Sequence, residues 1–349
     1  MKILKLLLFP FAALYNLVTS VRNYLYDIGH KPSFEFDIPV IAVGNLSVGG
    51  SGKTPMVEYL IELLKNQYGV ATLSRGYKRD TKGYRLAQED DTAKTIGDEP
   101  FQLFKKFGKE IKVVVGEDRV FAIPHILQEC PGTQVILLDD ALQHRSVKPQ
   151  LSILVTEYSN PFYKDFVLPF GRLREARTGA HRSDVIVVTK CSYDLSAEVE
   201  RTMSRSIQHY AGVKPVFFSA IQYGEPQSLG NGLAFSNNIV LVSGIANGHA
   251  LKEYCSLNLN IIKHFDFPDH HRYLENDLLE IENFCEIQSC PYSIVTTEKD
   301  MVKLIEPAFR PFTLRSPWYY MPIKHVFLQN GLKFDELVLK SILNSAGSK

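Results

Sequence analysis

The chain has 349 residues, of which 45% are hydrophobic, 22% charged and 11% aromatic. This length and composition predict a globular protein of about two domains and exclude a mostly disordered, collagen-like or coiled-coil chain. The 39 basic and 38 acidic side chains give a net charge of +1, so nucleic acid is not an expected partner. The five cysteines lack the spacing of a zinc site and are expected to be free thiols in a reducing compartment.

The first 30 residues are strongly apolar and form the first predicted element. Residues 3–18 are interrupted only by Lys5 and Asn16, include Pro10, and fall short of the roughly 20 apolar residues that span a bilayer. On a helix, their apolar side chains share one face and the polar ones lie roughly opposite. This pattern predicts that residues 1–30 contain a membrane-associated helix lying in the interface, with its start or a kink at Pro10. A helix packed on the protein's own core is the alternative.

Short apolar runs alternate with helix-like stretches through residues 31–220. Such runs, apolar on both faces, are typical of parallel strands covered by helices on both sides. They predict an α/β fold with a mostly parallel, P-loop NTPase-like sheet flanked by helices. The predicted strands of this domain are residues 39–43, 70–74, 111–115, 135–138, 151–155 and 185–189.

The rest of the chain predicts a linker and a second, smaller α/β lobe. Residues 221–238 are rich in Gly, Ser, Asn and Gln, as linkers often are. Further strands are predicted at 239–243, 292–296 and 318–322, within a lobe of residues 239–349. A cleft between the two lobes is the expected place for a ligand.

The strongest chemical signal is the segment PVIAVGNLSVGGSGKT at residues 39–54. A strand, a glycine-rich turn and a helix start predict a P-loop, whose backbone N–H groups surround phosphate oxygens. Lys53 is expected to neutralise the β- and γ-phosphates, and Thr54 to bind Mg²⁺. ATP is favoured over GTP because Ser192 stands where guanine-specific proteins carry aspartate. The predicted nucleotide-binding residues are Ser47, at a position where glycine is usual, Val48, Gly49, Gly50, Ser51, Gly52, Lys53 and Thr54.

Two carboxylates, Asp139 and Asp140, come directly after the apolar run at 135–138. A carboxylate at the end of such a strand is a usual ligand of Mg²⁺ beside the phosphates. Neighbouring side chains on a strand point in opposite directions, so only one of the pair is expected to face the metal directly. A solvated turn or helix cap is the alternative.

Five further segments carry side chains suited to phosphoryl transfer to an alcohol. Such transfer needs a group that takes or positions the hydroxyl proton, and cations near the transferred phosphate. Three of these segments also have a structural alternative: Asp98 as a helix N-cap, the arginines of residues 171–177 as a solvated face, and the histidines as surface or core residues. The segments are SRGYKR (74–79), GDEP (97–100), GRLREAR (171–177), FPDHHRY (267–273) and TTEKD (296–300).

In this order the motifs resemble those of the tetraacyldisaccharide 4'-kinases, the lipid A 4'-kinase family of Gram-negative bacteria. The resemblance implies transfer of the γ-phosphate of ATP to the 4'-hydroxyl of a tetraacylated disaccharide 1-phosphate at the cytoplasmic face of the inner membrane. It also implies two lobes joined by a strand linker and a hydrophobic N-terminal helix in contact with the membrane; no protein partner is expected. The matching segments are VGNLSVGGSGKTP, LSRGYKR, GDEP, DDALQHR, GRLRE, FPDHHRY and TTEKD.

The resemblance also places the family's site residues on this chain. It implies catalytic roles for Lys53, Asp98 and a second-lobe histidine, placed at His270 with His271 left open. Ala141 and Leu142 depart from the family's pattern but remove no ligand. The metal would be held by Thr54, Asp139, Asp140 and Glu175, and the substrate by Arg75, Tyr77, Glu99, Arg119, Gln143, His144 and Arg172.

Two other functions stay open from the residues alone. An ATPase-coupled ligase for a soluble substrate would share the P-loop and the tandem aspartates, but would have no use for the apolar N-terminal segment. A nucleotide-dependent switch or metallochaperone GTPase is disfavoured by Ser192 and by the lack of a Cys/His cluster.

Overall fold

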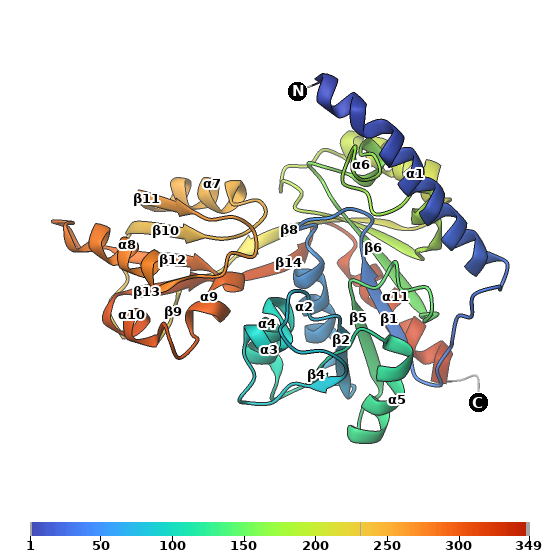
Figure 1. Cartoon of the computed structure of the whole chain (residues 1–349), viewed down its shortest axis with the longest axis horizontal. Helices are drawn as coiled ribbons and strands as arrows, with labels where there is room; N and C mark the ends of the chain where they lie inside the picture. Colours follow the sequence, from blue (N-terminus) through green and yellow to red (C-terminus); the bar gives the residue numbers. More distant parts are fainter. Residues whose placement is uncertain (1, 231, 347–349) are drawn as a thin grey trace.

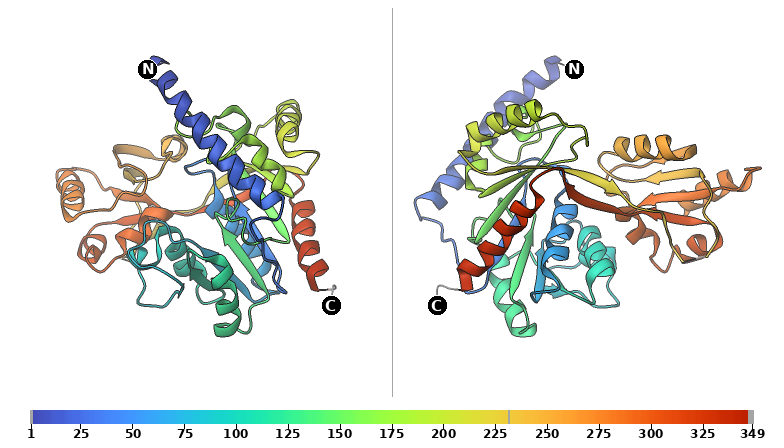
Figure 2. Two further views of the ribbon diagram at one scale, coloured as in Figure 1. Left: turned by 45° about the vertical axis from the view of Figure 1, so that its right-hand side comes forward. Right: turned by 180° about the vertical axis from the view of Figure 1, so that it is seen from behind.

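The computed structural model describes residues 2–230 and 232–346, which form two α/β lobes and a long N-terminal helix (Figures 1 and 2). Within these residues the larger lobe holds a nine-stranded sheet and the smaller one a five-stranded sheet. Most neighbouring strands are parallel, and helices flank both sheets. The predicted fold class is therefore confirmed.

The sheet of the first lobe has the strand order β14-β8-β7-β6-β1-β5-β2-β4-β3, and the edge strands β3 and β14 run antiparallel to their neighbours. Its inner strands are buried on both faces, as their continuous apolar sequences indicate. The strands are β1 (Val40–Gly44), β2 (Val70–Ser74), β3 (Arg85–Leu86), β4 (Lys112–Val115), β5 (Val135–Asp139), β6 (Leu151–Glu157), β7 (Val185–Thr189), β8 (Val216–Tyr223) and β14 (Ile323–Phe327).

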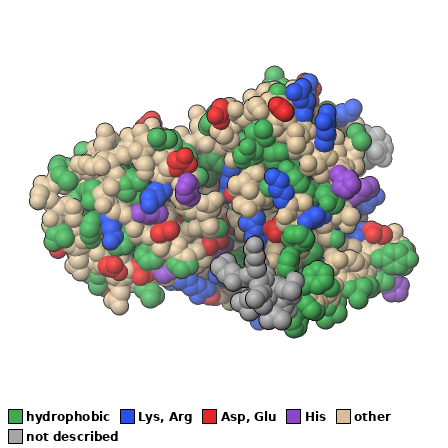
Figure 3. All heavy atoms as spheres, turned by 90° about the horizontal axis from the view of Figure 1, so that it is seen from above, with side chains coloured by type: hydrophobic (Ala, Val, Ile, Leu, Met, Phe, Trp, Pro, Cys, Tyr) green, Lys and Arg blue, Asp and Glu red, His purple; other side chains and the backbone are tan. Residues whose placement is uncertain are grey.

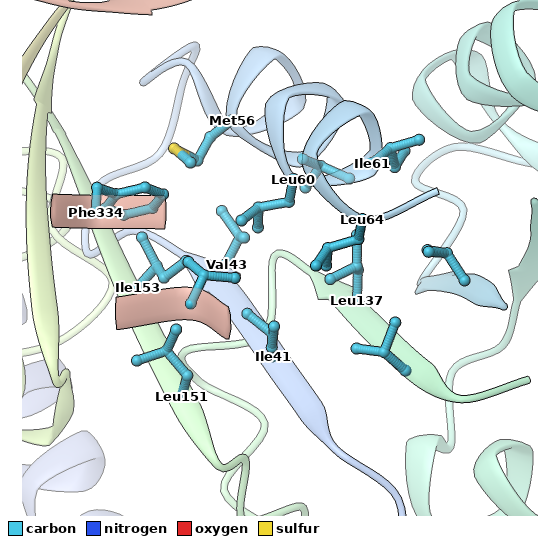
Figure 4. Packing of buried hydrophobic residues seen from close by; sticks show 14 of the residues in the cluster. Ile41, Val43, Met56, Leu60, Ile61, Leu64, Leu137, Leu151, Ile153 and Phe334 are labelled. Atoms are coloured by element: carbon cyan, nitrogen blue, oxygen red, sulfur yellow. The ribbon is translucent and has the colours of Figure 1, made fainter. Parts of the chain in front are cut away.

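Helices cover both faces of this sheet. One face is covered by α2 (Lys53–Leu64), α4 (Asp98–Phe107) and α11 (Gly331–Ala346), and the other by α5 (Arg119–Glu129) and α6 (Ala197–Ala211). Figure 4 shows side chains of α2 lying over those of β1, β5 and β6. Shorter elements complete the lobe: α3 (Ala93–Ile96) and the 3₁₀ helices η1 (Phe162–Lys164) and η2 (Arg177–Arg182).

The second lobe has the strand order β11-β10-β12-β13-β9, in which β9 is antiparallel to its neighbour and the other strands are parallel. Helix α7 packs on one face, and α8 and α10 on the other. Helix α9 also meets the first lobe, where Val302 packs with Ile96 and Phe101. The elements are β9 (Gln227–Ser228), β10 (Asn238–Ser243), α7 (His249–Asn258), β11 (Asn260–Asp266), α8 (Glu275–Glu286), β12 (Ser293–Thr297), α9 (Glu298–Leu304), α10 (Arg310–Arg315) and β13 (Trp318–Met321).

The chain passes between the lobes along two paired strands. β8 leads out and β14 returns antiparallel to it, with Tyr223 opposite Ile323 (Figure 2). After β14, helix α11 buries Phe334 against strands of the first lobe (Figure 4). The lobe predicted at 239–349 therefore differs from the structure at its C-terminal end, because the returning strand carries the last helix back to the first core.

Helix α1 (Lys2–Asp27) runs through Pro10 and lies across the first lobe (Figure 1). Three polar side chains of α1 form hydrogen bonds with the lobe. The Tyr15 hydroxyl donates to the Arg174 carbonyl at 3.0 Å, Arg22 donates to the Gln143 carbonyl at 2.6 Å, and the Asn23 amide donates to Glu175 at 2.7 Å. This polar inner face is the reverse of the usual amphipathic arrangement.

Most of the large apolar side chains that the structure describes on α1 are exposed. In the view from above, hydrophobic side chains gather along this edge of the first lobe (Figure 3). A helix whose apolar face packs on the protein's own core is therefore not what the structure shows. No helix in the described part of the chain has the length and hydrophobicity needed to cross a membrane. The exposed side chains are Phe9, Phe11, Leu14, Leu17, Val18, Val21 and Tyr24.

Candidate active site

The predicted P-loop connects β1 to α2 at the carboxyl end of the parallel strands. Gly52 has a φ of 86° and lies so close to Thr189 that an added Cβ would come within 3.1 Å of its hydroxyl. The Thr189 hydroxyl donates to the Ser51 carbonyl at 2.7 Å, and the Asn45 amide donates to the Ser51 hydroxyl at 2.7 Å. These contacts fix the loop just before Lys53, the first residue of α2.

The loop forms a shallow pocket together with the end of β6. The Val48 amide donates to the Arg172 carbonyl at 2.8 Å, and Asp165 holds the Arg172 side chain at 3.0 Å. Arg172, predicted to contact the acceptor substrate, thus lies beside the nucleotide-binding residues. The pocket is lined by Asn45, Ser47, Val48, Gly49, Gly50, Ser51, Val155, Thr156, Glu157, Asn160 and Arg172.

The tandem carboxylates have different surroundings. Asp139 ends β5 and is 3% exposed, and its Oδ1 atom has no hydrogen-bond partner among the described residues. Asp140 instead faces cations: its oxygens lie 3.6 Å from Lys53 Nζ and 2.7 and 2.9 Å from the guanidinium of Arg174. The two carboxylates therefore lie in different environments, and which of them faces a metal stays a prediction.

Electrostatics separate the two carboxyl groups further. Burial and the nearby Glu99 raise the pKa of Asp139 to about 7. Burial also acts to raise the pKa of Asp140, but Lys53 and Arg174 outweigh it and hold this pKa well below its usual range. The Asp139 oxygen without a partner in the described chain and the Thr54 hydroxyl in the first turn of α2 are hard oxygen ligands of the kind that Mg²⁺ prefers. Thr54 and Asp139 therefore fit a magnesium ion.

A second group of functional side chains forms where the lobes meet. Asp98 begins α4, His270 lies in the loop between β11 and α8, and His270 Nδ1 is 3.1 Å from Asp98 Oδ2. Gly97 occupies the N-cap position of α4, and the Asp98 carboxylate is paired with His270, so the N-cap alternative for Asp98 is not supported. The contact joins residues 172 positions apart in the sequence.

The structure distinguishes the two neighbouring histidines. His271 stacks on Phe267 with ring centroids 4.5 Å apart, and its Nε2 atom is 2.8 Å from Asp277 Oδ2, all within the second lobe. His270 is the member of this pair that contacts Asp98, so it is the histidine that the geometry favours.

Two lysines of α9 complete this group and were not singled out from the sequence. Lys303 Nζ lies 3.6 Å from Asp98 Oδ2, and Lys299 Nζ lies 3.1 Å from His270 Nε2. Burial acts to raise the pKa of Asp98, but its hydrogen bond with His270 and the charge of Lys303 lower it overall. Asp98 is therefore a carboxylate near neutral pH. The TTEKD motif contains Lys299, but spacing alone gives no sign of what it contacts.

Two of the predicted substrate-binding residues, Tyr77 and Glu99, lie at this group. The Tyr77 ring meets His270 edge-on with centroids 5.4 Å apart, and Glu99 lies 3.7 Å from Lys299. Arg75 is exposed in the loop that comes after β2.

Other predicted residues have supporting contacts instead. Glu175 is 3% exposed and accepts hydrogen bonds from Asn23, Gln143 and Arg182 at 2.7 to 2.8 Å, which leaves its predicted metal role unsupported. Gln143 also donates to the Asn45 carbonyl at 3.0 Å and so braces the start of the P-loop. These contacts tie α1 to the nucleotide-binding loop.

Arg119 is buried and His144 is partly buried, whereas both are predicted to contact the substrate. Arg119 is 1% exposed, and its guanidinium donates to the carbonyls of Gly116 and Glu117 at 3.1 and 3.3 Å. Burial and the charge of Arg119 lower the pKa of His144 to about 4, so this ring is neutral. Arg119 therefore holds the backbone between β4 and α5 from inside the lobe.

An ion-pair network forms another contact between the lobes. Lys106 Nζ lies 2.7 Å from Glu58 of α2 and 2.8 Å from Glu298 of α9. Glu298 also accepts a hydrogen bond from the backbone of Ile323, at the start of β14, at 3.2 Å. The network thus links the helix after the P-loop, the second lobe and the strand that returns from it.

The fold and site define a P-loop phosphotransferase, with a triphosphate-binding loop, tandem carboxylates on the adjacent strand and a carboxylate–histidine pair between the lobes. A family profile described as tetraacyldisaccharide-1-P 4'-kinase matches residues 4–343, and the chain belongs to this family. The resemblance carried by the motifs is therefore confirmed.

Relatives with the same family name match this chain along almost their whole length. The tetraacyldisaccharide 4'-kinase of Flavobacterium johnsoniae is 43% identical over 347 residues, covering 98% of each chain. The enzyme of Cytophaga hutchinsonii is 40% identical, covering 99% of this chain and 96% of its own. The crystal structure of LpxK from Aquifex aeolicus in complex with ATP is 29% identical with a TM-score of 0.75, covering 97% of this chain and 99% of its own.

Proposed function

We propose that this protein transfers the γ-phosphate of ATP to the 4'-hydroxyl of a tetraacyldisaccharide 1-phosphate. The observation that carries the proposal is the Asp98–His270 contact, which joins a carboxylate of the P-loop lobe to a histidine of the second lobe. ATP as donor is supported by the Aquifex aeolicus relative, whose structure was solved in complex with ATP. The acceptor is supported by the names of the relatives.

In the proposed reaction each group has one task. The P-loop amides and Lys53 hold the β- and γ-phosphates, and Asp98 accepts the proton of the sugar hydroxyl. The sugar oxygen bonds to the γ-phosphorus while the bond to the bridging oxygen of ADP breaks. Held by Thr54 and Asp139, Mg²⁺ would supply positive charge to the phosphates.

An acceptor assay with labelled ATP tests this function. The full-length protein should transfer label to the disaccharide lipid in detergent micelles, and Asp98→Asn should lower kcat by about 10²- to 10³-fold, as expected for a lost general base. The Kd for ATP should stay within about twofold, because Asp98 lies outside the P-loop. ATP hydrolysis without lipid labelling would support an ATPase-coupled ligase, and nucleotide binding alone would support a switch protein.

We also propose that α1 lies on the cytoplasmic face of the inner membrane. The lobe forms hydrogen bonds with polar side chains of this helix. The exposed apolar side chains of α1 can therefore enter a lipid interface while these contacts stay in place. Phe170 extends this apolar surface, because its ring packs on Phe9 at 6.2 Å and on the exposed Phe166 at 5.2 Å. A membrane-bound enzyme can phosphorylate a lipid headgroup while the acyl chains stay in the bilayer, which avoids a cost of about 0.8 kcal/mol per exposed CH₂.

Vesicle sedimentation tests the membrane contact. The double change Leu14→Glu and Leu17→Glu should release the protein from anionic vesicles and raise the apparent KM for lipid. Leu257→Glu with Ile287→Glu is a matched control, since these side chains are at least as exposed but lie on the second lobe. Equal release by both double variants would refute the proposed role of α1.

A further inference from the structure

Lys299 has a position that the proposed transfer reaction does not explain by itself. It lies on α9, is 20% exposed at its side chain, and places Nζ 3.1 Å from His270 Nε2, on the ring edge opposite Asp98. It is held there by Asp269 at 3.4 Å and by Glu99 at 3.7 Å. An imidazole ring thus lies between a carboxylate on one nitrogen and an ammonium on the other.

The hydrogen-bonding capacity of these groups allows only one position for the proton of the neutral His270 ring. An ammonium group has donors only, so a close Nε2 atom has to accept. The single proton of a neutral imidazole then resides on Nδ1, where it is donated to the Asp98 carboxylate at 3.1 Å. A second proton on Nε2 would place two donors and two positive charges face to face.

We propose that Lys299 is a positioning residue that fixes His270 as a neutral ring with its proton on Nδ1, directed at Asp98. This inference rests on the proposed roles of Asp98 and His270, and it adds what sets their protonation. The lone pair of Asp98 that is not engaged by His270 or Lys303 then stays free for the hydroxyl proton. Glu99 and Asp269 keep Lys299 charged: burial lowers its pKa, but these carboxylates outweigh burial and raise it overall.

The groups around His270 determine how the ring responds when the ammonium group is removed. The charged or titratable groups that face the ring are Asp98 from α4, Tyr77 from the loop after β2, Lys299 from α9 and Asp269 from the same loop as His270. The Asp269 carboxylate lies 3.8 Å from Nε2. Without Lys299, carboxylates would face both nitrogens, so the ring would take up a second proton more readily.

Nitrogen NMR of the full-length protein tests the protonation state directly. With ¹⁵N-labelled histidine and assignment by His270→Gln, wild-type His270 should show the Nδ1-protonated neutral pattern at pH 7. Lys299→Met should convert it to the doubly protonated or the Nε2-protonated pattern. Lys299→Arg is the matched control, because guanidinium also has only donors, and it should keep the wild-type pattern. An unchanged pattern in Lys299→Met would overturn the proposal.

Kinetics give a second readout that a merely structural lysine would not change. Lys299→Met should lower kcat on the order of tenfold, part of the 10²- to 10⁴-fold that a positioned base contributes, and leave the KM for ATP within about twofold. Its kcat should fall on the acidic side at a higher pH than that of the wild type, since an imidazolium beside Asp98 weakens the base. Lys299→Arg should keep the wild-type kcat and the wild-type pH profile. A loss like that of Lys299→Met would count against the proposal.

A double-mutant cycle separates action through His270 from independent damage. In a His270→Ala background, Lys299→Met should cost less than about twofold in kcat, because the ring it positions is gone. Fully additive losses would overturn the proposal. If the wild-type protein phosphorylated no lipid acceptor, the proposed function would fail, whereas the NMR pattern would still decide the role of Lys299.

Discussion

The P-loop region and the Asp98–His270 region are assembled in different ways. The first is local: Asn45, Ser51 and Lys53 lie within nine residues on one strand, turn and helix, and their contacts are made inside the first lobe. The second joins residues 172 positions apart and exists only where the lobes meet. In the proposed reaction, phosphate binding therefore depends on residues of one lobe, while activation of the acceptor depends on how the two lobes pack.

This difference predicts that the two regions fail in different ways when they are altered. A change in the P-loop should remove nucleotide binding and turnover together. A change at the lobe contact should lower turnover and leave nucleotide binding nearly intact. Variants of each region can separate these two outcomes.

The largest effect is expected for Lys53→Ala. Lys53 is the proposed cation of the phosphate site and lies 3.6 Å from Asp140, so its removal also leaves that carboxylate with fewer partners. Turnover should fall by about 10³-fold or more, and ATP binding by isothermal titration should weaken by at least about tenfold. Retention of wild-type ATP affinity would place the triphosphate elsewhere.

The histidine pair gives a matched comparison at the lobe contact. His270→Ala should lower kcat by about 10²-fold with little change in ATP affinity, because it removes the partner of Asp98. His271→Ala removes a similar carboxylate–histidine pair with Asp277, but within the second lobe, so it should lower the melting temperature and leave kcat within about threefold. The opposite result would assign the catalytic role to His271.

A smaller effect on stability is expected for Lys106→Met. This change leaves Glu58 and Glu298, both largely buried, without their shared cation. The side chain of Lys106 is 29% exposed, so the expected loss in the free energy of unfolding is only about 1–2 kcal/mol. Lys109→Met, at an exposed lysine after the same helix, is the control for urea unfolding and should have no comparable effect.

The smallest effect concerns the pH dependence contributed by Glu58. Burial and the charge of Glu298 raise its pKa from 4.5 to about 7. Between these values the folded protein holds a proton that the unfolded chain has lost, so this group makes stability fall as pH rises from about 4.5 to about 7.

Glu58→Gln should remove this contribution. Between about pH 5 and pH 7 its unfolding free energy should fall by about 1–2 kcal/mol less than that of the wild type. Glu62→Gln, at an exposed glutamate on the same helix, should reproduce the wild-type profile. Parallel curves for wild type and Glu58→Gln would show that Glu58 is ionised in the folded protein throughout this range.

The sequence predicted the central strands well because these strands are covered on both faces. Six apolar runs in the first lobe match strands to within two residues. Strands β8, β11 and β14 were missed for physical reasons. β11 and β14 lie at sheet edges with partly exposed residues, and β8 extends into the segment whose composition indicated a linker. Edge and connecting strands carry weaker apolar patterns.

The site shows the same limit of local patterns. The P-loop could be predicted from consecutive residues, whereas the pairing of Asp98 with His270 entered only through the family resemblance. The family resemblance placed Glu175 at the metal, but its oxygens accept hydrogen bonds from Asn23, Gln143 and Arg182. The direction in which a long side chain points depends on neighbours that are distant in the chain. A single sequence does not reveal which residues these neighbours are.

The paired strands between the lobes have a consequence for biosynthesis on the ribosome. Because α11 packs beside β1 and α2, the first lobe needs residues that are translated after the whole of the second lobe. The first lobe therefore remains an incomplete sheet, with its α11-binding surface uncovered, until the second lobe has been translated. The second lobe can fold before the first lobe is complete. Truncations that remove the last helix should consequently yield aggregating protein rather than an enzyme lacking only a tail.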